Sequence, residues 1–159
     1  MEALDAFDLQ ILDILQKDNG ISQRDIGEQI GLSAPAVQRR IRRLHNTGVI
    51  RANVAVIDPD KVGRPITLLV EVVMEAEKID LLDAAKEHFK RAPEVQQCYY
   101  VTGGTDFILV IVVDSMHAYE ELTRRLFFSN DNIRHFKTFV AMDRVKTGME
   151  LPLTLLRPE

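Results

Sequence analysis

The chain has 159 residues, of which 46% are hydrophobic and 28% charged, a composition that predicts a folded core in one domain or two small ones. Its single cysteine, Cys98, excludes a disulfide framework or a cysteine-based zinc site within one chain, and we expect this residue to be buried in a strand. No apolar run approaches the roughly 20 residues of a membrane span, and the acidic N-terminus is unlike a signal peptide, so we expect a cytoplasmic protein that does not contact a membrane.

The net charge of −4 is unevenly distributed along the chain. The segment 29–57 contains no Asp or Glu but carries five arginines, so it contributes +5 and leaves −9 for the remainder. This asymmetry predicts one local anionic partner rather than a generally adhesive surface.

Two short helices are predicted before residue 32. Apolar residues recur at helical spacing over residues 4–15, and the polar run 18–20 ends that helix. The second helix follows Ser22, which forms a capping-box pattern with Asp25 three residues later. Gly31 suits the left-handed position that follows a helix end.

A third predicted helix follows Ser33, has Pro35 in its first turn and ends at Gly48. One of its faces is apolar: Val37, Ile41 and Leu44. A short helix, a tight turn and an arginine-rich second helix are typical of a helix-turn-helix, so we expect double-stranded DNA as the partner. The alternative is an ordinary solvated arginine face on an amphipathic helix.

Nine residues of this region are the predicted DNA contacts. Those expected at base edges in the major groove are Ser33, Ala34, Pro35, Gln38 and Arg39. Those expected at phosphates are Arg40, Arg42, Arg43 and Arg51.

The chain beyond the helices is predicted to be mostly sheet. The segment 49–58 alternates between apolar and polar residues and is rich in β-branched residues, which predicts a strand leaving the helices. The stretch 58–65, which contains turn-forming Asp, Pro and Gly, predicts a domain boundary. The elements expected after it are a strand at 66–75, a helix from Asp80 to about Arg91, strands at 94–102 and 107–114, a helix from Ser115 to about Phe128, and a strand at 133–143. This βαββαβ order is the ferredoxin-like pattern, so the fold class is α+β, with an N-terminal winged-type helix-turn-helix.

Several stretches, in this order and spacing, resemble the Lrp/AsnC (leucine-responsive regulatory protein) family of transcription regulators: "LDAFDLQILDILQKDNGISQRDIGEQIGLS", "RRIRRLHNTGVIRANVAVIDPDKVG", "EVQQCYYVTGGTDFILVIV" and "TFVAMDRVK". The resemblance implies a helix-turn-helix joined to an amino-acid-sensing βαββαβ domain. It also implies homodimers that assemble into tetramers or octamers, with effector pockets between dimers. Bulky Phe136 stands where smaller polar residues are common in the family, so leucine and asparagine are not carried over as ligands.

The domains are therefore expected at 1–60 (DNA binding, with the linking strand), 61–146 (effector binding and oligomerisation) and 147–159 (a tail of unassigned role). The resemblance puts effector binding on a glycine-rich hairpin turn and its approach: Tyr100, Gly103, Gly104, Thr105 and Asp106. Backbone N–H groups at the glycines can cradle a carboxylate, and Asp106 can pair with an ammonium. Taken alone, these residues favour a plain hairpin turn, because glycine-rich hairpins are common.

No catalytic residue, metal site or cofactor is predicted. The sequence has no phosphate-binding glycine loop, nucleophile elbow or Cys/His pairing, and its four histidines lack metal-ligand spacing. We therefore expect not an enzyme but a sequence-specific DNA-binding transcriptional regulator that responds to a small effector, an amino acid by the resemblance. The alternatives are a ligand-independent architectural DNA-binding protein, and an enzyme or enzyme regulatory subunit of amino-acid metabolism.

Overall fold

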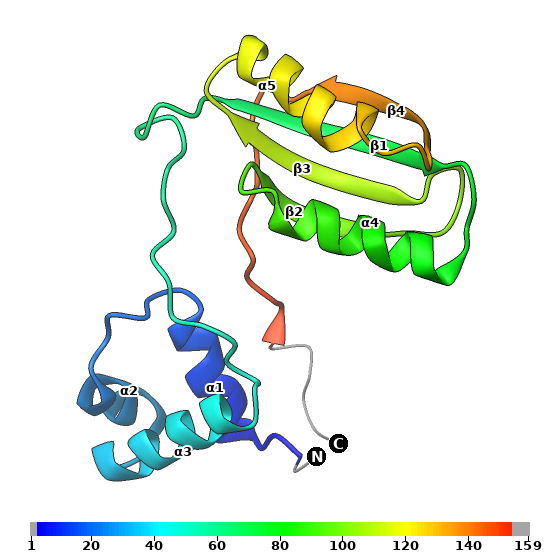
Figure 1. Ribbon diagram of the computed structural model, residues 1–159. Helices are drawn as coiled ribbons and strands as arrows, with labels where there is room; N and C mark the ends of the chain where they lie inside the picture. Colours follow the sequence, from blue (N-terminus) through cyan, green and yellow to red (C-terminus); the bar gives the residue numbers. More distant parts are fainter. Residues whose placement is uncertain (1–2, 154–159) are drawn as a thin grey trace. The chain divides into compact units, whose positions relative to one another are not determined.

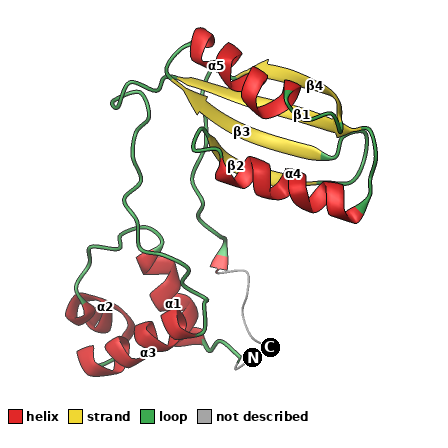
Figure 2. Ribbon diagram, viewed as in Figure 1, coloured by secondary structure: helices red, strands yellow, loops and turns green. Residues whose placement is uncertain are grey.

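The structure is a computed structural model that describes residues 3–153, so the end of the unassigned tail, residues 154–159, lies outside the described residues (Figures 1 and 2). The chain divides into two compact units, residues 3–55 with 146–153, and residues 56–145. The first unit contains three helices and the second a sheet with helices on it, each around its own apolar core. This arrangement confirms the predicted α+β class.

The helical unit has three helices, as predicted: α1 (Ala6–Leu15), α2 (Gln23–Ile30) and α3 (Ala34–Asn46). Its buried core confirms the apolar stripes of all three: Ile11, Ile26, Val37 and Leu44. Ser22 caps α2 by accepting from the backbone N–H of Asp25, and Gly31 is left-handed with φ 74°, both as predicted. The turn also depends on Gly27, because a Cβ there would lie 2.3 Å from the Leu32 carbonyl oxygen.

Residues 49–58 do not form the predicted strand. The structure shows them without regular secondary structure, and the side chains of Val54 and Val56 are 74% and 98% exposed. A strand requires a second backbone to pair with, and no described segment of this chain supplies one here. The segment therefore has the sequence pattern of a strand but does not pair with another strand within the described part of the chain.

The second unit is a four-stranded sheet in the order β2-β3-β1-β4, in which every neighbouring pair is antiparallel. Its strands are β1 (Ile66–Met74), β2 (Val95–Tyr100), β3 (Phe107–Val113) and β4 (Ile133–Val140). Helices α4 (Ile79–Arg91) and α5 (Met116–Thr123) cover the same face of the sheet (Figure 1). The chain order confirms the predicted βαββαβ pattern.

Two local predictions about this unit were wrong, the cap of α4 and the burial of Cys98, and one helix end has a different geometry. Helix α4 begins after Lys78, whose carbonyl already accepts the first helical bond, and Asp80 lies inside the first turn. The helix predicted from Ser115 to about Phe128 does reach Phe128, but its last part, η1 (Arg124–Phe128), is π-helical. Cys98 lies in a strand, as predicted, but it is exposed: β2 is an edge strand, with a neighbouring strand on one side only.

The sheet face opposite the helices remains uncovered in the described part of the chain. It carries large apolar side chains that are 40–51% exposed: Leu69, Tyr99 and Phe139. Leu69 pairs with Phe139 on one side and with Val110 on the other, so apolar side chains continue across neighbouring strands.

Candidate functional site

The outer face of α3 presents most of the predicted DNA contacts to solvent. Exposed residues of this set are Ser33, Pro35, Gln38, Arg39, Arg42 and Arg51, while Ala34 is half-buried. Pro35 lies in the first turn, so the polar residues that follow it project from the N-terminal half of the helix. Among the described residues, no carboxylate forms an ion pair with Arg39, Arg42 or Arg51. These three cations are therefore available to an anionic partner.

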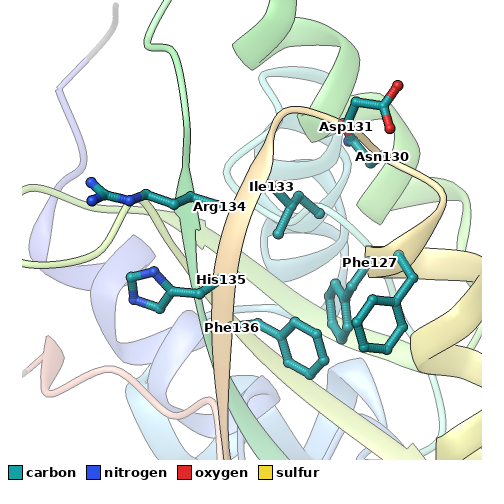
Figure 3. A pocket seen from close by; sticks show the side chains of 8 residues that line it. Phe127, Asn130, Asp131, Ile133, Arg134, His135 and Phe136 are labelled. Carbon is teal, nitrogen blue, oxygen red and sulfur yellow. The ribbon is translucent and has the colours of Figure 1, made fainter.

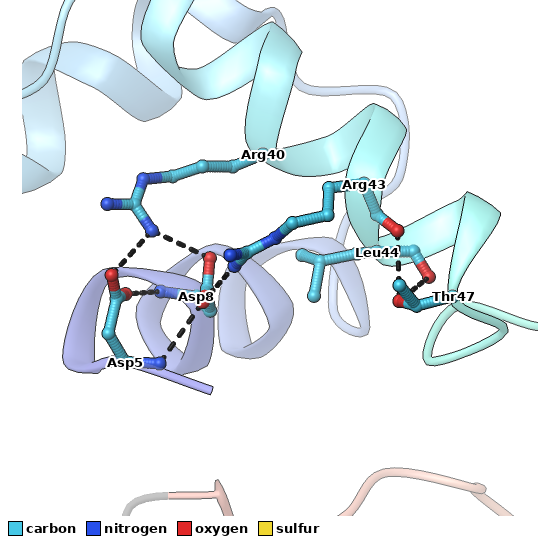
Figure 4. Close-up of polar contacts among 6 residues, drawn as sticks. All are labelled: Asp5, Asp8, Arg40, Arg43, Leu44 and Thr47. Atoms are coloured by element: carbon cyan, nitrogen blue, oxygen red, sulfur yellow. Dashed lines mark hydrogen bonds and ion pairs between the residues drawn. The ribbon is translucent and has the colours of Figure 1, made fainter. Parts of the chain in front are cut away.

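Two other arginines of α3 turn toward α1 instead (Figure 4). Nη1 of Arg40 donates to Asp8 Oδ1 at 2.8 Å and to Asp5 Oδ2 at 2.7 Å, while Nη2 of Arg43 donates to Asp8 Oδ2. The Asp8 side chain has no solvent exposure. Arg40 and Arg43 were predicted to contact phosphates together with Arg42 and Arg51, but the structure gives these two an intramolecular carboxylate partner.

The acidic partners are held in place by the start of α1. Asp5 caps the helix by accepting from the Asp8 N–H at 2.9 Å, and its own N–H donates to Asp8 Oδ2 at 3.1 Å. Burial raises the pKa of the Asp5 carboxyl, but hydrogen bonds from the Asp8 backbone and from Arg40 outweigh burial and hold this pKa below its ordinary value. Hydrogen bonds to the Asp5 and Asp8 carboxylates raise the pKa of the Arg40 guanidinium, so the pair is charged at neutral pH.

The predicted effector turn lies between β2 and β3. Gly103 has φ 130°, a conformation that side chains rarely adopt, and open space surrounds the Cα of both Gly103 and Gly104. Both glycines are exposed, so their backbone groups are accessible to a ligand.

The next two residues of this turn also hold the end of β1. The hydroxyl of Thr105 donates to the Val72 carbonyl at 2.8 Å, and the Met74 N–H donates to Asp106 Oδ2 at 2.7 Å. The turn therefore has a structural role, since it holds the end of β1. This role uses one carboxylate oxygen of Asp106 and leaves the other oxygen for a second partner.

Tyr100 is directed to the side of the sheet that carries α4. Its ring centroid lies 5.2 Å from that of Phe107, and Nζ of Lys86 lies 5.1 Å from the Tyr100 ring. Tyr100 is half exposed, at 49%. The structure thus places it on the helical face of an edge strand, where one side of the ring is accessible.

A further feature, which no site prediction included, is an open pocket of about 470 Å³ beside β4 (Figure 3). Its lining is Phe127, Phe128, Asn130, Asp131, Ile133, Arg134, His135 and Phe136. The ring centroids of Phe127 and Phe136 are 4.4 Å apart, and those of Phe128 and Phe136 are 5.5 Å apart. The signal in the sequence was bulky Phe136, but its aromatic neighbours come from η1, whose geometry no helical pattern predicts.

The start of β4 is irregular at this pocket. Val73 pairs with His135 and Met74 with Ile133, so Arg134 lies between two paired positions. Figure 3 shows Arg134 and His135 extending to one side of β4 and Phe136 to the other. Such irregularities redirect side chains and are common beside binding sites.

The described residues contain no group of three or more His, Cys, Asp or Glu side chains that could hold a metal ion. None of the helices in residues 3–153 combines the length and the apolarity that a membrane crossing requires.

Both units match known protein families. Residues 4–51 match the winged helix-turn-helix DNA-binding family, and residues 67–151 match the Lrp/AsnC ligand binding domain. An uncharacterized HTH-type transcriptional regulator of Sinorhizobium fredii is 43% identical over 96% of this chain and 90% of its own length. A glutamate uptake regulatory protein of Zymomonas mobilis is 35% identical over 94% of this chain and 91% of its own length. A leucine-responsive regulatory protein of Haemophilus influenzae is 30% identical over 91% and 87%.

Solved structures agree with these matches. The crystal structure of an AsnC family transcriptional regulator from Agrobacterium tumefaciens has a TM-score of 0.90 and 33% identity, covering 96% of this chain and 99% of that one. A Neisseria meningitidis transcriptional regulator in complex with L-Met has a TM-score of 0.89 over 97% of this chain and 99% of that one, but at 24% identity it supports the fold alone. The predicted regulator fold, with one DNA-binding and one ligand-binding domain, is confirmed.

Proposed function

Because this chain belongs to the Lrp/AsnC family of transcriptional regulators, we propose that it reads DNA with the outer face of α3 and adjusts this binding to an amino-acid effector. The observation that carries the proposal is the exposed basic face of α3, which has Gln38 and Arg39 near its start and Arg42 further along. Polar side chains at the start of a recognition helix suit base edges, and exposed arginines suit phosphates. The acidic remainder of the chain disfavours DNA contact elsewhere.

The effector is an amino acid in this proposal. Support comes from the match of residues 67–151 to a ligand binding domain and from relatives named for leucine and glutamate. The accessible backbone at Gly103 and Gly104 suits a carboxylate, and the remaining oxygen of Asp106 suits an ammonium. The aromatic pocket beside Phe136 suits an apolar portion of the ligand. In this proposal, another copy of the chain contributes that pocket to the site.

The working form in this proposal is a homodimer that assembles further. The uncovered apolar sheet face around Leu69 and Phe139 offers one surface for a second copy. The segment 49–58 offers another, because its strand-type pattern finds no partner within the described chain. Two recognition helices about 34 Å apart would fit successive major grooves, so a pseudo-palindromic operator is expected.

The protein works in the cytoplasm, where its DNA target lies, and it performs no catalysis in this proposal. The relatives are transcriptional regulators, and the described residues nominate no nucleophile with a base beside it. An architectural DNA-binding protein is the competing function. It would share the basic face of α3 and differ in having no use for the turn at Gly103.

Two measurements on the intact protein test the proposal. Fluorescence anisotropy with a mixed-sequence duplex should show an affinity that falls steeply as salt rises. Thermal denaturation with each of the twenty amino acids at millimolar concentration should show a selective rise, since a ligand at 100 times its Kd adds about 2.7 kcal/mol. No DNA retention at low salt would refute the DNA role. DNA binding without any amino-acid shift would favour the architectural function.

A further inference from the structure

The residue that caps the C-terminal end of α1, Gln16, binds the C-terminal segment of the same chain. Nε2 of Gln16 donates to the Leu151 carbonyl at 2.9 Å, and the Leu151 N–H donates to Gln16 Oε1 at 2.9 Å. Two reciprocal bonds between a side-chain amide and the N–H and carbonyl of one residue fix both the position and the direction of the bound backbone. Leu151 is 135 residues away in sequence, so this is a tertiary contact rather than a local turn.

Charged neighbours surround this contact. Nε2 of Gln16 also donates to Asp13 Oδ1 at 3.1 Å, and Nζ of Lys17 donates to Asp13 Oδ2 at 2.7 Å. The hydrogen bond from Lys17 to Asp13 raises the pKa of the Lys17 ammonium, and the charge of Glu150 adds to this increase. Glu150 therefore lies close enough to attract Lys17, which supports the same placement of the tail.

The tail is also anchored where it leaves the ligand-binding domain. Nη1 of Arg144 donates to the Thr67 hydroxyl of β1 at 3.1 Å, and Nη2 of Arg144 donates to Asp60. Asp60 lies in the segment that leads from the helices into the sheet. Arg144 thus joins the entering and leaving segments of this domain, a few residues after the end of β4.

Helix α1 in turn supports the recognition helix. Asp5 and Asp8 at its start bind Arg40 and Arg43 of α3, and Ile11 packs in the core that α3 shares. A displacement of α1 therefore acts on α3 through the ion pairs of the buried Asp8 carboxylate and through packing.

We propose that residues 146–153 form a strap, clamped to α1 through Gln16 and Leu151, that transmits the state of β4 to the recognition helix. The inference rests on the proposed function for its DNA readout. In this inference, DNA affinity is regulated through a surface of α1 that binds the C-terminal segment of the same chain. Effector binding beside β4 alters DNA affinity only if it favours either the clamped or the released state of the strap. Because such coupling is reciprocal, DNA binding must then also shift the strap between these two states.

The clamp itself can be tested without ligand or DNA. Gln16→Leu removes both reciprocal bonds, and Gln10→Leu is the matched control, because Gln10 is an exposed glutamine on the same helix. In full-length protein, amide hydrogen exchange at Leu151 should accelerate about threefold or more in Gln16→Leu and stay unchanged in Gln10→Leu. Equal exchange at Leu151 in all three proteins would overturn the clamp.

The coupling is tested by DNA affinity for the mixed-sequence duplex, with and without the amino acid that gives the largest thermal shift. Gln16→Leu should reduce the ratio of the two Kd values toward one, while its Kd without ligand stays within about twofold of wild type. Leu151→Pro, which removes the tail's N–H without altering α1, should do the same even if Gln16→Leu folds poorly. An unchanged ratio in both variants would reduce the strap to a structural contact and overturn the regulatory role. If the wild-type protein binds neither DNA nor any amino acid, the proposed function and the coupling fail together, and the exchange measurement still decides the clamp.

Discussion

The carboxylate of Asp8, fully buried at the start of α1, accepts a hydrogen bond at 2.8 Å from the guanidinium of Arg40 on the recognition helix (Figure 4). Removing one partner of a buried ion pair is costly, because the other charge is then left without compensation. The pair therefore couples the orientation of α3 to that of α1. It also separates the arginines of α3 into two groups with different expected roles.

Arg42→Ala should weaken binding to all DNA sequences, because an exposed arginine on the outer face of α3 suits a phosphate. Each lost phosphate contact should reduce the slope of log K against log salt by about 0.9. Anisotropy titrations over a range of salt concentrations measure this slope. Lys90→Ala, which removes an exposed positive charge from α4, is the control and should leave the slope unchanged. An unaltered slope in Arg42→Ala would mean that Arg42 contacts no phosphate.

Arg40→Ala should affect folding more than Arg42→Ala does. The Asp8 oxygen that accepts from Arg40 would lose its donor, at a cost of about 1–3 kcal/mol in the free energy of unfolding. Urea denaturation measures this cost, and Arg42→Ala should remain within about 0.5 kcal/mol of wild type. Equal stability of the two variants would contradict a supporting role for the Asp8–Arg40 pair.

Gln38→Ala should change the choice among operators more than the overall affinity. Gln38 is exposed in the N-terminal half of α3, where side chains reach base edges, and a good base contact provides about 1–3 kcal/mol of discrimination. Selection of bound sequences from a random library would measure the change. Equal losses on selected and random DNA would show that Gln38 reads no base.

Asp106→Asn should abolish the amino-acid response while DNA binding persists. Asparagine keeps an oxygen that can accept from the Met74 N–H, so the end of β1 stays held, but the charge that would pair with an ammonium is lost. Asp106→Ala removes both functions and should also lower the melting temperature. A thermal shift of wild-type size in Asp106→Asn would remove Asp106 from the effector site.

Acid should weaken the helical unit through Asp5. The folded-state pKa of Asp5 lies below its ordinary value of 3.8, so the stability that Asp5 contributes is present above that value and is lost as pH falls through the lowered pKa. The effect should be small, because the Asp5 side chain is 50% exposed and solvent screens its charge. Urea denaturation between neutral and acidic pH should show a flatter pH dependence in Asp5→Asn than in wild type. Asp80→Asn, at an exposed aspartate of α4, is the comparison, and the same flattening there would contradict a specific role for Asp5.

The sequence by itself determined the elements and their order. Caps such as Ser22, the left-handed Gly31 and the apolar stripes act within a few residues, so the three N-terminal helices and the βαββαβ pattern could be predicted from local rules. The basic face of the third helix followed from the same periodicity together with the absence of acidic residues from 29 to 57. The family resemblance, and with it the DNA-binding and ligand-binding domains, rested on these local features.

Only the tertiary structure decided which of those residues have partners. Helical spacing gives the direction of Arg40 relative to its own helix, but whether a carboxylate lies there depends on how α1 packs against α3. The segment 49–58 has the pattern of a strand, yet pairing requires a second backbone that the described chain does not supply. Phe127 lies beside Phe136 because of a π-helical turn, an unusual backbone geometry. The contact of Gln16 with Leu151 joins residues that are far apart in the sequence. Such contacts depend on the packing of whole elements, and no local pattern encodes them.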